Sequence, residues 1–315
     1  MKLIINPSRL TALLFFFFAL QLASCKKEQS GGGGNPQDEE FASRASSEAD
    51  AESEIIFNDV FDNVLGVNND FGIAGTGVFG RANLGTESGI VSRGDTIRCF
   101  TITYIHLNPP DVFPARVILD FGAGCIGRDG HHRSGKIITT YTNRLVIPGA
   151  VATTTFDNFK FDGIKVEGTH EITNLSIPVS VTNPILVHKW KVAVEGAKLT
   201  KPNGNYTEWN STKYIAQVEG MLTPFIPLDD FYKIEGNANG KVKRDNIIVA
   251  WRAEITEALV KKFSCRWIVK GKIKVVRQTL SNTSPWVALL DYGNGNCDNK
   301  ALVTINGVTH EITLP

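Results

Sequence analysis

The chain has 315 residues, of which 33 are Lys or Arg and 32 are Asp or Glu, and 42% are hydrophobic. This near-neutral balance argues against nucleic acid as a partner, because proteins that bind it carry a strongly basic face. The apolar content, which includes 18 Phe and 5 Trp, is enough for a packed core. The length allows one large all-β domain or two small ones.

Residues 1–24 have the three parts of an export signal. Lys2 and Arg9 give it a positive start, and residues 10–20 form an apolar run that is too short to span a bilayer. The run ends in Leu22-Ala23-Ser24-Cys25, which resembles the lipobox that lipoprotein signal peptidase recognises. We therefore expect cleavage before Cys25 and lipid on its thiol. The alternative is an ordinary secretory signal with a chance cysteine.

Lipid on Cys25 predicts that the membrane is a partner of the mature chain, because two or more acyl chains anchor a protein stably. No later stretch reaches 18 uninterrupted apolar residues, so the sequence predicts no second anchor. Lys26, rather than Asp, follows the cysteine. By resemblance to enterobacterial sorting, that residue favours the outer membrane of the cell envelope. The periplasmic and the surface face both stay open.

Residues 25–45, with a run of four glycines, are expected to form a flexible tether. An amphipathic helix is predicted for 46–66. Acidic residues come early in that segment, which suits the helix dipole. Ile56, Val60 and Val64 recur at helical spacing, and Gly66 is a stop signal. Such a helix either covers one end of a sheet or docks a partner.

Residues 67–315 are predicted to be all-β. Trp190, Val192 and Val194 alternate with polar residues, as in an antiparallel strand with one buried face. Asp162-Gly163 and Asn306-Gly307 separate such runs and predict two-residue hairpins. The expected architecture is an antiparallel β-sandwich or an extended twisted meander.

An internal duplication divides this β domain into pseudo-repeats of about 90–180 and 185–315. Each copy has a cysteine that opens a strand, then an Asp-aromatic-Gly turn that leads to a second cysteine, and later the sequence Thr-His-Glu-Ile-Thr, at 169–173 and 309–313. An even set of cysteines in an exported protein indicates disulfides. The repeat selects the pairs Cys99–Cys125 and Cys265–Cys297. We therefore expect two sheets, each pinned by one disulfide.

Few residues suggest metal chemistry. The Thr-His-Glu-Ile-Thr segments lack the second His of the zinc-protease motif, since Asn174 and Leu314 stand in its place. Zinc bound by cysteines is disfavoured because no Cys-x₂-Cys spacing occurs. His131-His132 fits a solvated turn better than a metal site. Calcium stays open at a turn rich in oxygen ligands, which consists of Asp291, Asn294, Asn296 and Asp298.

No catalytic residue or cofactor site is predicted, because neither a Gly-x-Ser-x-Gly elbow nor a spare cysteine nucleophile occurs. Three functions are considered. The first is a non-enzymatic envelope lipoprotein with a structural or binding role and an envelope protein as a partner. The second is a glycan- or polymer-binding surface lipoprotein, which a row of exposed Trp or Tyr would favour. The third is a hydrolase whose paired carboxylates only the fold would reveal. Asp95-Thr96-Ile97 weakly resembles an O-glycosylation site.

Several segments together resemble a family of uncharacterised Bacteroidetes-type lipoproteins. The resemblance implies membrane attachment and an all-β domain, and it brings no assigned activity. It covers most of 46–315. The segments that carry it, besides the lipobox, are Phe57-Asn58-Asp59-Val60-Phe61, Asp120-Phe121-Gly122 with Cys125-Ile126-Gly127-Arg128-Asp129-Gly130, Thr154-Thr155-Phe156-Asp157-Asn158, Cys265-Arg266-Trp267-Ile268-Val269, and Asp291-Tyr292-Gly293 with Cys297-Asp298-Asn299-Lys300.

Overall fold

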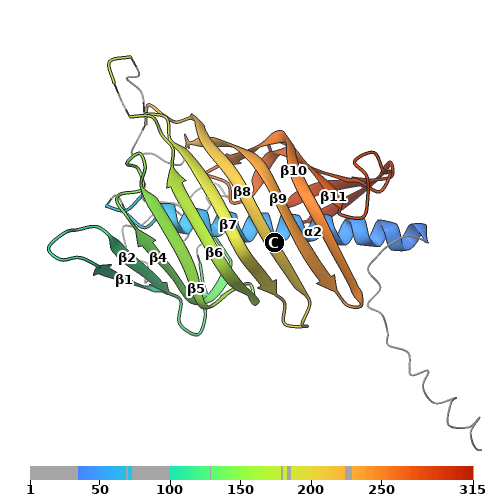
Figure 1. The fold of residues 1–315 in the computed structure, drawn as a ribbon, viewed down its shortest axis with the longest axis horizontal. Helices are drawn as coiled ribbons and strands as arrows, with labels where there is room; N and C mark the ends of the chain where they lie inside the picture. The colour runs from blue at the N-terminus through green and yellow to red at the C-terminus, as the bar shows by residue number, and fades with distance from the viewer. Residues whose placement is uncertain are drawn as a thin grey trace, which may run out of the picture.

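The computed structural model describes residues 35–68, 70–72, 99–127, 129–178, 180–182, 186–223 and 229–314. This part of the chain forms one long helix and a single antiparallel sheet of 14 strands (Figure 1). The elements are α2 (Pro36–Leu65), β1 (Thr101–His106), β2 (Ala115–Asp120), β3 (Cys125–Ile126), β4 (His132–Tyr141), β5 (Val151–Phe161), β6 (Ile164–Asn174), β7 (Lys189–Thr200), β8 (Tyr206–Glu219), β9 (Phe231–Arg244), β10 (Ile247–Lys262), β11 (Ile268–Arg277), β12 (Ala288–Asn294), β13 (Lys300–Ile305) and β14 (Val308–Thr313).

The sheet is an open meander in which consecutive strands are neighbours, with the short β3 pairing beside β4. This confirms the all-β class and selects the meander over the sandwich. The expectation of two separate sheets is wrong. β6 and β7, on either side of the boundary between the pseudo-repeats, pair from Lys165↔Thr200 to Asn174↔Trp190. Main-chain hydrogen bonds therefore continue across the boundary, and the two repeats share one sheet.

The helix is longer than the sequence indicated, because residues 36–45 belong to it and not to a tether. Asn35 caps its first turn by accepting a hydrogen bond from the Gln37 amide at 3.2 Å. Pro36 suits the first helical position because it has no N–H to leave unbonded. Gly66 follows the last turn, as expected. Residues 25–34 lie outside the described part.

The helix crosses the sheet along its inner face, and the sheet curves around it (Figure 1). It contacts β6 and every strand from β8 to β13. The expectation that it covers one end of the sheet is therefore wrong. Ile56, Val60 and Phe61 are at most 1% exposed, so its apolar side is used by this chain's own core. Ala45, Ser46 and other small buried residues let the helix approach the strands closely.

Glycine bulges bend the sheet around the helix. Gly168 in β6 and Gly271 in β11 lie at register shifts and have φ of +116° and +113°. A Cβ on Gly168 would lie 2.7 Å from Ala197 Cα, and one on Gly271 would lie 2.6 Å from the Ala258 carbonyl oxygen. Such bulges increase the twist and bend of a strand. These glycines are therefore required for the curvature.

Both predicted hairpins are confirmed. Asp162-Gly163 joins β5 to β6 with φ of 48° and 81°, and Asn306-Gly307 joins β13 to β14 with φ of 49° and 78°. Positive φ at both central positions defines the type I′ turn that matches the twist of paired strands. The alternation in β7 is confirmed too, since Trp190, Val192 and Val194 are at most 6% exposed.

Candidate functional site

The acidic side chains of α2 meet basic side chains from the strands. The carboxylates all come from the helix and the cations from several parts of the sheet, so ion pairs connect the helix to the sheet along its length. The pairs are Glu39 with Arg277, Glu48 with Arg244 at 2.6 Å, Glu52 with Lys201 at 2.8 Å, Glu54 with Lys213 at 3.0 Å, Asp59 with Arg133 at 2.5 Å, and Asp62 with Lys261 at 2.9 Å.

Arg133 in β4 is the centre of a dense group of polar contacts. Its side chain is fully buried between two carboxylates. Nε donates to Asp59 Oδ2 at 3.0 Å and Nη2 to Asp59 Oδ1 at 2.5 Å. Nη1 donates to Asp129 Oδ1 at 3.0 Å. The guanidinium also lies 5.2 Å from the ring centre of Phe161.

The two carboxylates keep this group ionised. Burial lowers the pKa of Arg133, but Asp59 and Asp129 outweigh it, so the pKa lies above its ordinary value. Burial raises the pKa of Asp129, but hydrogen bonds from Arg133 and its charge outweigh that effect, so this pKa is lowered. Both shifts favour the charged forms of Arg133 and Asp129, which supports an ion pair between them.

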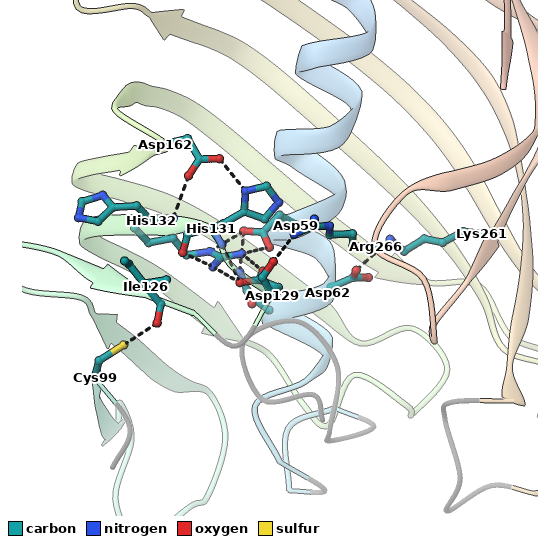
Figure 2. Close-up of polar contacts among 12 residues, drawn as sticks. Asp59, Asp62, Cys99, Ile126, Asp129, His131, His132, Asp162, Lys261 and Arg266 are labelled. Atoms are coloured by element: carbon teal, nitrogen blue, oxygen red, sulfur yellow. Dashed lines mark hydrogen bonds and ion pairs between the residues drawn. The ribbon is translucent and has the colours of Figure 1, made fainter. Parts of the chain in front are cut away.

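His131 connects the same cluster to the β5–β6 hairpin. Its Nδ1 lies 2.6 Å from Asp162 Oδ2, and Asp162 Oδ1 accepts the His132 amide at 2.8 Å. The His131 ring is buried, whereas the His132 side chain is exposed and points away from it (Figure 2). The two rings do not converge on one ion. Among the described residues no group of three or more His, Cys, Asp or Glu could hold a metal.

Arg266, between β10 and β11, contacts the connection between β3 and β4. It follows Cys265 and donates to the main-chain oxygen of Asp129, which lies just beyond Cys125 (Figure 2). Its guanidinium also lies 4.0 Å from the ring centre of Trp267. The two repeated cysteine turns are therefore brought together at one end of the helix. The sequence showed the repeat but not this contact.

Both disulfides have the predicted partners. Cys99 and Cys125 have a Cα–Cα distance of 5.5 Å, and Cys265 and Cys297 one of 5.8 Å. The two Asp-aromatic-Gly turns also have the same hydrogen bond. The Gly122 amide donates to Asp120 Oδ1 at 2.9 Å, and the equivalent bond from the Gly293 amide to Asp291 Oδ1 is 2.9 Å.

The turn that was considered for calcium is organised by its own chain. Asp291 accepts from the Gly293 amide and lies 3.4 Å from the Lys272 ammonium. Asp298 Oδ1 accepts the Lys300 amide at 3.0 Å. These carboxylates cap main-chain amides and face a lysine, so the turn needs no ion to hold it.

The two Thr-His-Glu-Ile-Thr segments have different surroundings. His170 in β6 is fully buried against the helix, with its ring 6.3 Å from that of Phe57. Burial lowers its pKa to about 3, so it is neutral. His310 in β14 has Nε2 3.0 Å from Glu40 Oε1 near the start of the helix. Neither imidazole has the second histidine that a zinc-protease site needs.

Asp50 has a role that the sequence did not reveal. This helix residue is fully buried, and its Oδ1 accepts hydrogen bonds from Trp209 Nε1 at 3.0 Å and Trp251 Nε1 at 3.2 Å. Burial raises its pKa, and Lys213 offsets this only in part. The sequence signal for this role was a carboxylate on the same side of the helix as the apolar residues. A charge buried there requires hydrogen-bond partners.

The tryptophans are mainly core residues. Trp190, Trp209 and Trp251 are at most 1% exposed, and Trp267 and Trp286 are partly buried against the core. No row of exposed Trp therefore crosses the described sheet. A cavity beside Glu54 and Ser211 has a volume of about 20 Å³, which is room for about one water molecule and not for a substrate.

Cys25 and Asp95-Thr96-Ile97 lie outside the described residues. Within the described residues, no helix has the length and apolar character to cross a membrane. No family model, curated protein or solved structure matches the chain.

Proposed function

We propose that this protein is a lipid-anchored lipoprotein of the cell envelope, with a structural or binding role and no catalytic activity. One observation carries the proposal furthest. The helix that follows the lipobox is the element around which the whole sheet is built. An anchor on Cys25 would therefore hold the folded body itself, and not a loosely attached domain.

The spacing supports this arrangement. Ten residues, 26–35, separate Cys25 from the first residue of the helix. The eleven residue steps from Cys25 to Pro36 span at most about 40 Å when the chain is fully extended. The start of α2 would thus stay within that distance of the bilayer. Lys26 supports the outer membrane as the location.

The two other functions gain no support from the residues around the helix. Glycan stacking needs a row of exposed aromatic rings. Trp190, Trp209 and Trp251 are buried, and the exposed Tyr104 and Tyr214 lie on β1 and β8, which are not neighbours in the sheet. A hydrolase needs paired carboxylates that a substrate can reach. The carboxylates Asp59 and Asp129 are both bonded to Arg133 inside the fold, and Asp50 is covered completely.

Intact-mass analysis of protein extracted from membranes tests the proposal, with wild type and Cys25→Ala measured side by side. We expect the wild-type chain to begin at Cys25 and to carry the mass of a diacylglyceryl group and a further acyl chain. Cys25→Ala should lack this mass and leave the membrane fraction. An unlipidated wild-type chain cut at another position would overturn the proposal.

A further inference from the structure

The outer face of the sheet has a hollow where two central strands separate. β9 and β10 lie side by side in the middle of the sheet (Figure 1). They pair from Arg244↔Ile247 to Lys241↔Ala250, and pairing resumes only at Ile234↔Leu259. Between these points, Glu235–Gly240 of β9 and Trp251–Ala258 of β10 form no ladder with each other.

The separation is built into the strand lengths. The unpaired run has six residues in β9 and eight in β10, from the numbering of the flanking pairs. The two extra residues add about 7 Å of strand, and they lie in bulges of β10, because Ile255–Val260 also has two residues more than Lys270–Ile273 of β11. β9 stays paired with β8 along its whole run, and β10 stays paired with β11 from Trp251 to Ile255 and again at Glu257. The hollow is therefore an opening inside a sheet that is intact on both sides, and we call Glu235–Gly240 with Trp251–Ala258 the slot.

The Trp251 indole lies beneath the slot on the core side and is fully buried, so it is not part of the lining. Its ring lies so close to Gly240 that a Cβ there would be 2.6 Å from Trp251 Cζ2. The indole is fixed from below by its hydrogen bond to Asp50 on the helix. Ala238 and Ala253 are buried on the same inner side. The slot is thus open to the outer face and closed toward the core.

The size and lining of the slot suit a hydrogen-bonding ligand. Its volume is about 640 Å³, within the range of about 300–1,000 Å³ that is typical of ligand sites. Amide and charged side chains surround it, and no aromatic ring is among the lining residues. Those side chains are Glu235, Asn237, Asn239, Arg252, Glu254, Lys274 and Asn282.

The edges of β9 and β10 that border the slot direct main-chain N–H and C=O groups toward each other. In an antiparallel strand, every second residue directs its N–H and C=O toward the same neighbour. About three residues of the β9 run, and about two of the regular stretch Trp251–Ile255 of β10, therefore face the slot without a ladder partner. Main-chain donors and acceptors in a sheet interior are normally paired. A ligand with the same alternation of donors and acceptors would form hydrogen bonds with both strand edges.

We propose that the slot binds a short extended peptide segment of a partner protein, through main-chain hydrogen bonds to β9 and β10. Strand addition of this kind takes its affinity from the backbone and its specificity from side-chain contacts. The side chains of the segment would contact four charged residues of the lining, which are Arg252, Lys274, Glu235 and Glu254. A sugar is the poorer fit, since no ring in the lining offers a stacking face. The inference does not depend on the lipid anchor.

Hydrogen exchange on the full mature protein, read by mass spectrometry, tests the slot without any ligand. Within 235–240 and 251–258, the amides that face the slot should exchange faster than those of the flanking pairs at 231–234 and 241–244. Equal protection of all these amides would show a closed sheet and overturn the proposal.

The probe for binding is a pool of blocked hexapeptides randomised at each position. We expect it to slow exchange at 235–240 and 251–258 by about threefold or more. A pool with N-methylated backbones should have no effect, because it lacks the amide donors. Asn239→Trp, which fills the slot, should abolish the protection. Lys191→Trp, on the outer face of β7 and away from the slot, should retain it.

Three results would overturn the peptide assignment. The first is no protection from the peptide pool. The second is equal protection from the N-methylated pool, which would show that main-chain bonds are not used. The third is protection by maltohexaose but not by peptides, which would assign the slot to a glycan. In each case lipidation of Cys25 is unaffected, so failure here is distinguishable from failure of the proposed function.

Discussion

Arg133 on β4 and Asp59 on α2 form a two-point ion pair, with Nε to Oδ2 at 3.0 Å and Nη2 to Oδ1 at 2.5 Å. The residues are 74 positions apart in the chain. A second carboxylate, Asp129, binds the other side of the guanidinium. This bidentate geometry uses the planar fork that only arginine offers, and it fixes the C-terminal half of the helix to the early strands.

Replacing Arg133 should therefore be costly. Arg133→Met leaves two carboxylates buried without their cation, and we expect a loss of about 3–5 kcal/mol in the free energy of unfolding. Urea unfolding followed by tryptophan fluorescence measures it. The matched control is Lys136→Met in the same strand, whose half-exposed ammonium lies 3.4 Å from Asp120. That variant should lose less than about 1 kcal/mol, and equal losses would contradict the buried network.

His170 should make the fold sensitive to acid. Its pKa in the folded protein is lowered to about 3 by burial, against 6.5 ordinarily. The unfolded chain therefore binds the extra proton between these values, and stability falls as pH falls from about 6.5 toward 3. The loss between pH 6.5 and 5 should be about 2 kcal/mol. His170→Phe should remove this part of the pH dependence, as measured by urea unfolding at each pH.

The control for that experiment is His132→Gln, because the His132 side chain is exposed. It should leave the slope of stability against pH unchanged. An unchanged slope in His170→Phe would show that the buried imidazole does not govern the acid response.

The disulfides should stabilise each cysteine turn. The pair Cys265–Cys297 closes a loop with a sequence separation of 32, for which chain entropy predicts about 3–4 kcal/mol. Cys265→Ala with Cys297→Ala should show this loss in urea. Thiol alkylation of the wild type should label none of the four cysteines 99, 125, 265 and 297 before reduction and all of them afterwards. Free alkylation without reduction would refute the pairing.

Gly168 should tolerate no side chain. A Cβ would lie 2.7 Å from Ala197 Cα and would require a φ of +116°. Gly168→Ala should destabilise the fold by more than about 3 kcal/mol, since a clash adds to the backbone strain. Gly293→Ala is the control, because its φ is +86° but nothing lies within 4 Å of the added Cβ. It should cost only about 1–3 kcal/mol, and the difference measures the clash.

Some features were readable from local sequence because local chemistry decides them. Asp162-Gly163 adopts the positive φ values of a hairpin turn, as these residue types predict. The alternation along β7 identified the face of that strand, with Trp190, that is buried. The helix boundary was misplaced at 46, because residues 36–45 contain few of the apolar residues that mark a helix. Their small side chains are buried by contact with the sheet, which the local pattern does not show.

The sequence by itself determined the all-β class, the pairing of the four described cysteines and the expectation of a lipid anchor at Cys25. Each depends on residues close in the chain, or on a repeat that marks equivalent positions. Only the tertiary structure decided that the two repeats share one sheet and that the sheet surrounds the helix. It also placed Arg133 between Asp59 and Asp129 and parted β9 from β10. These outcomes depend on strand register and on the approach of distant charges, and both are set by the packing of the whole chain rather than by any local segment.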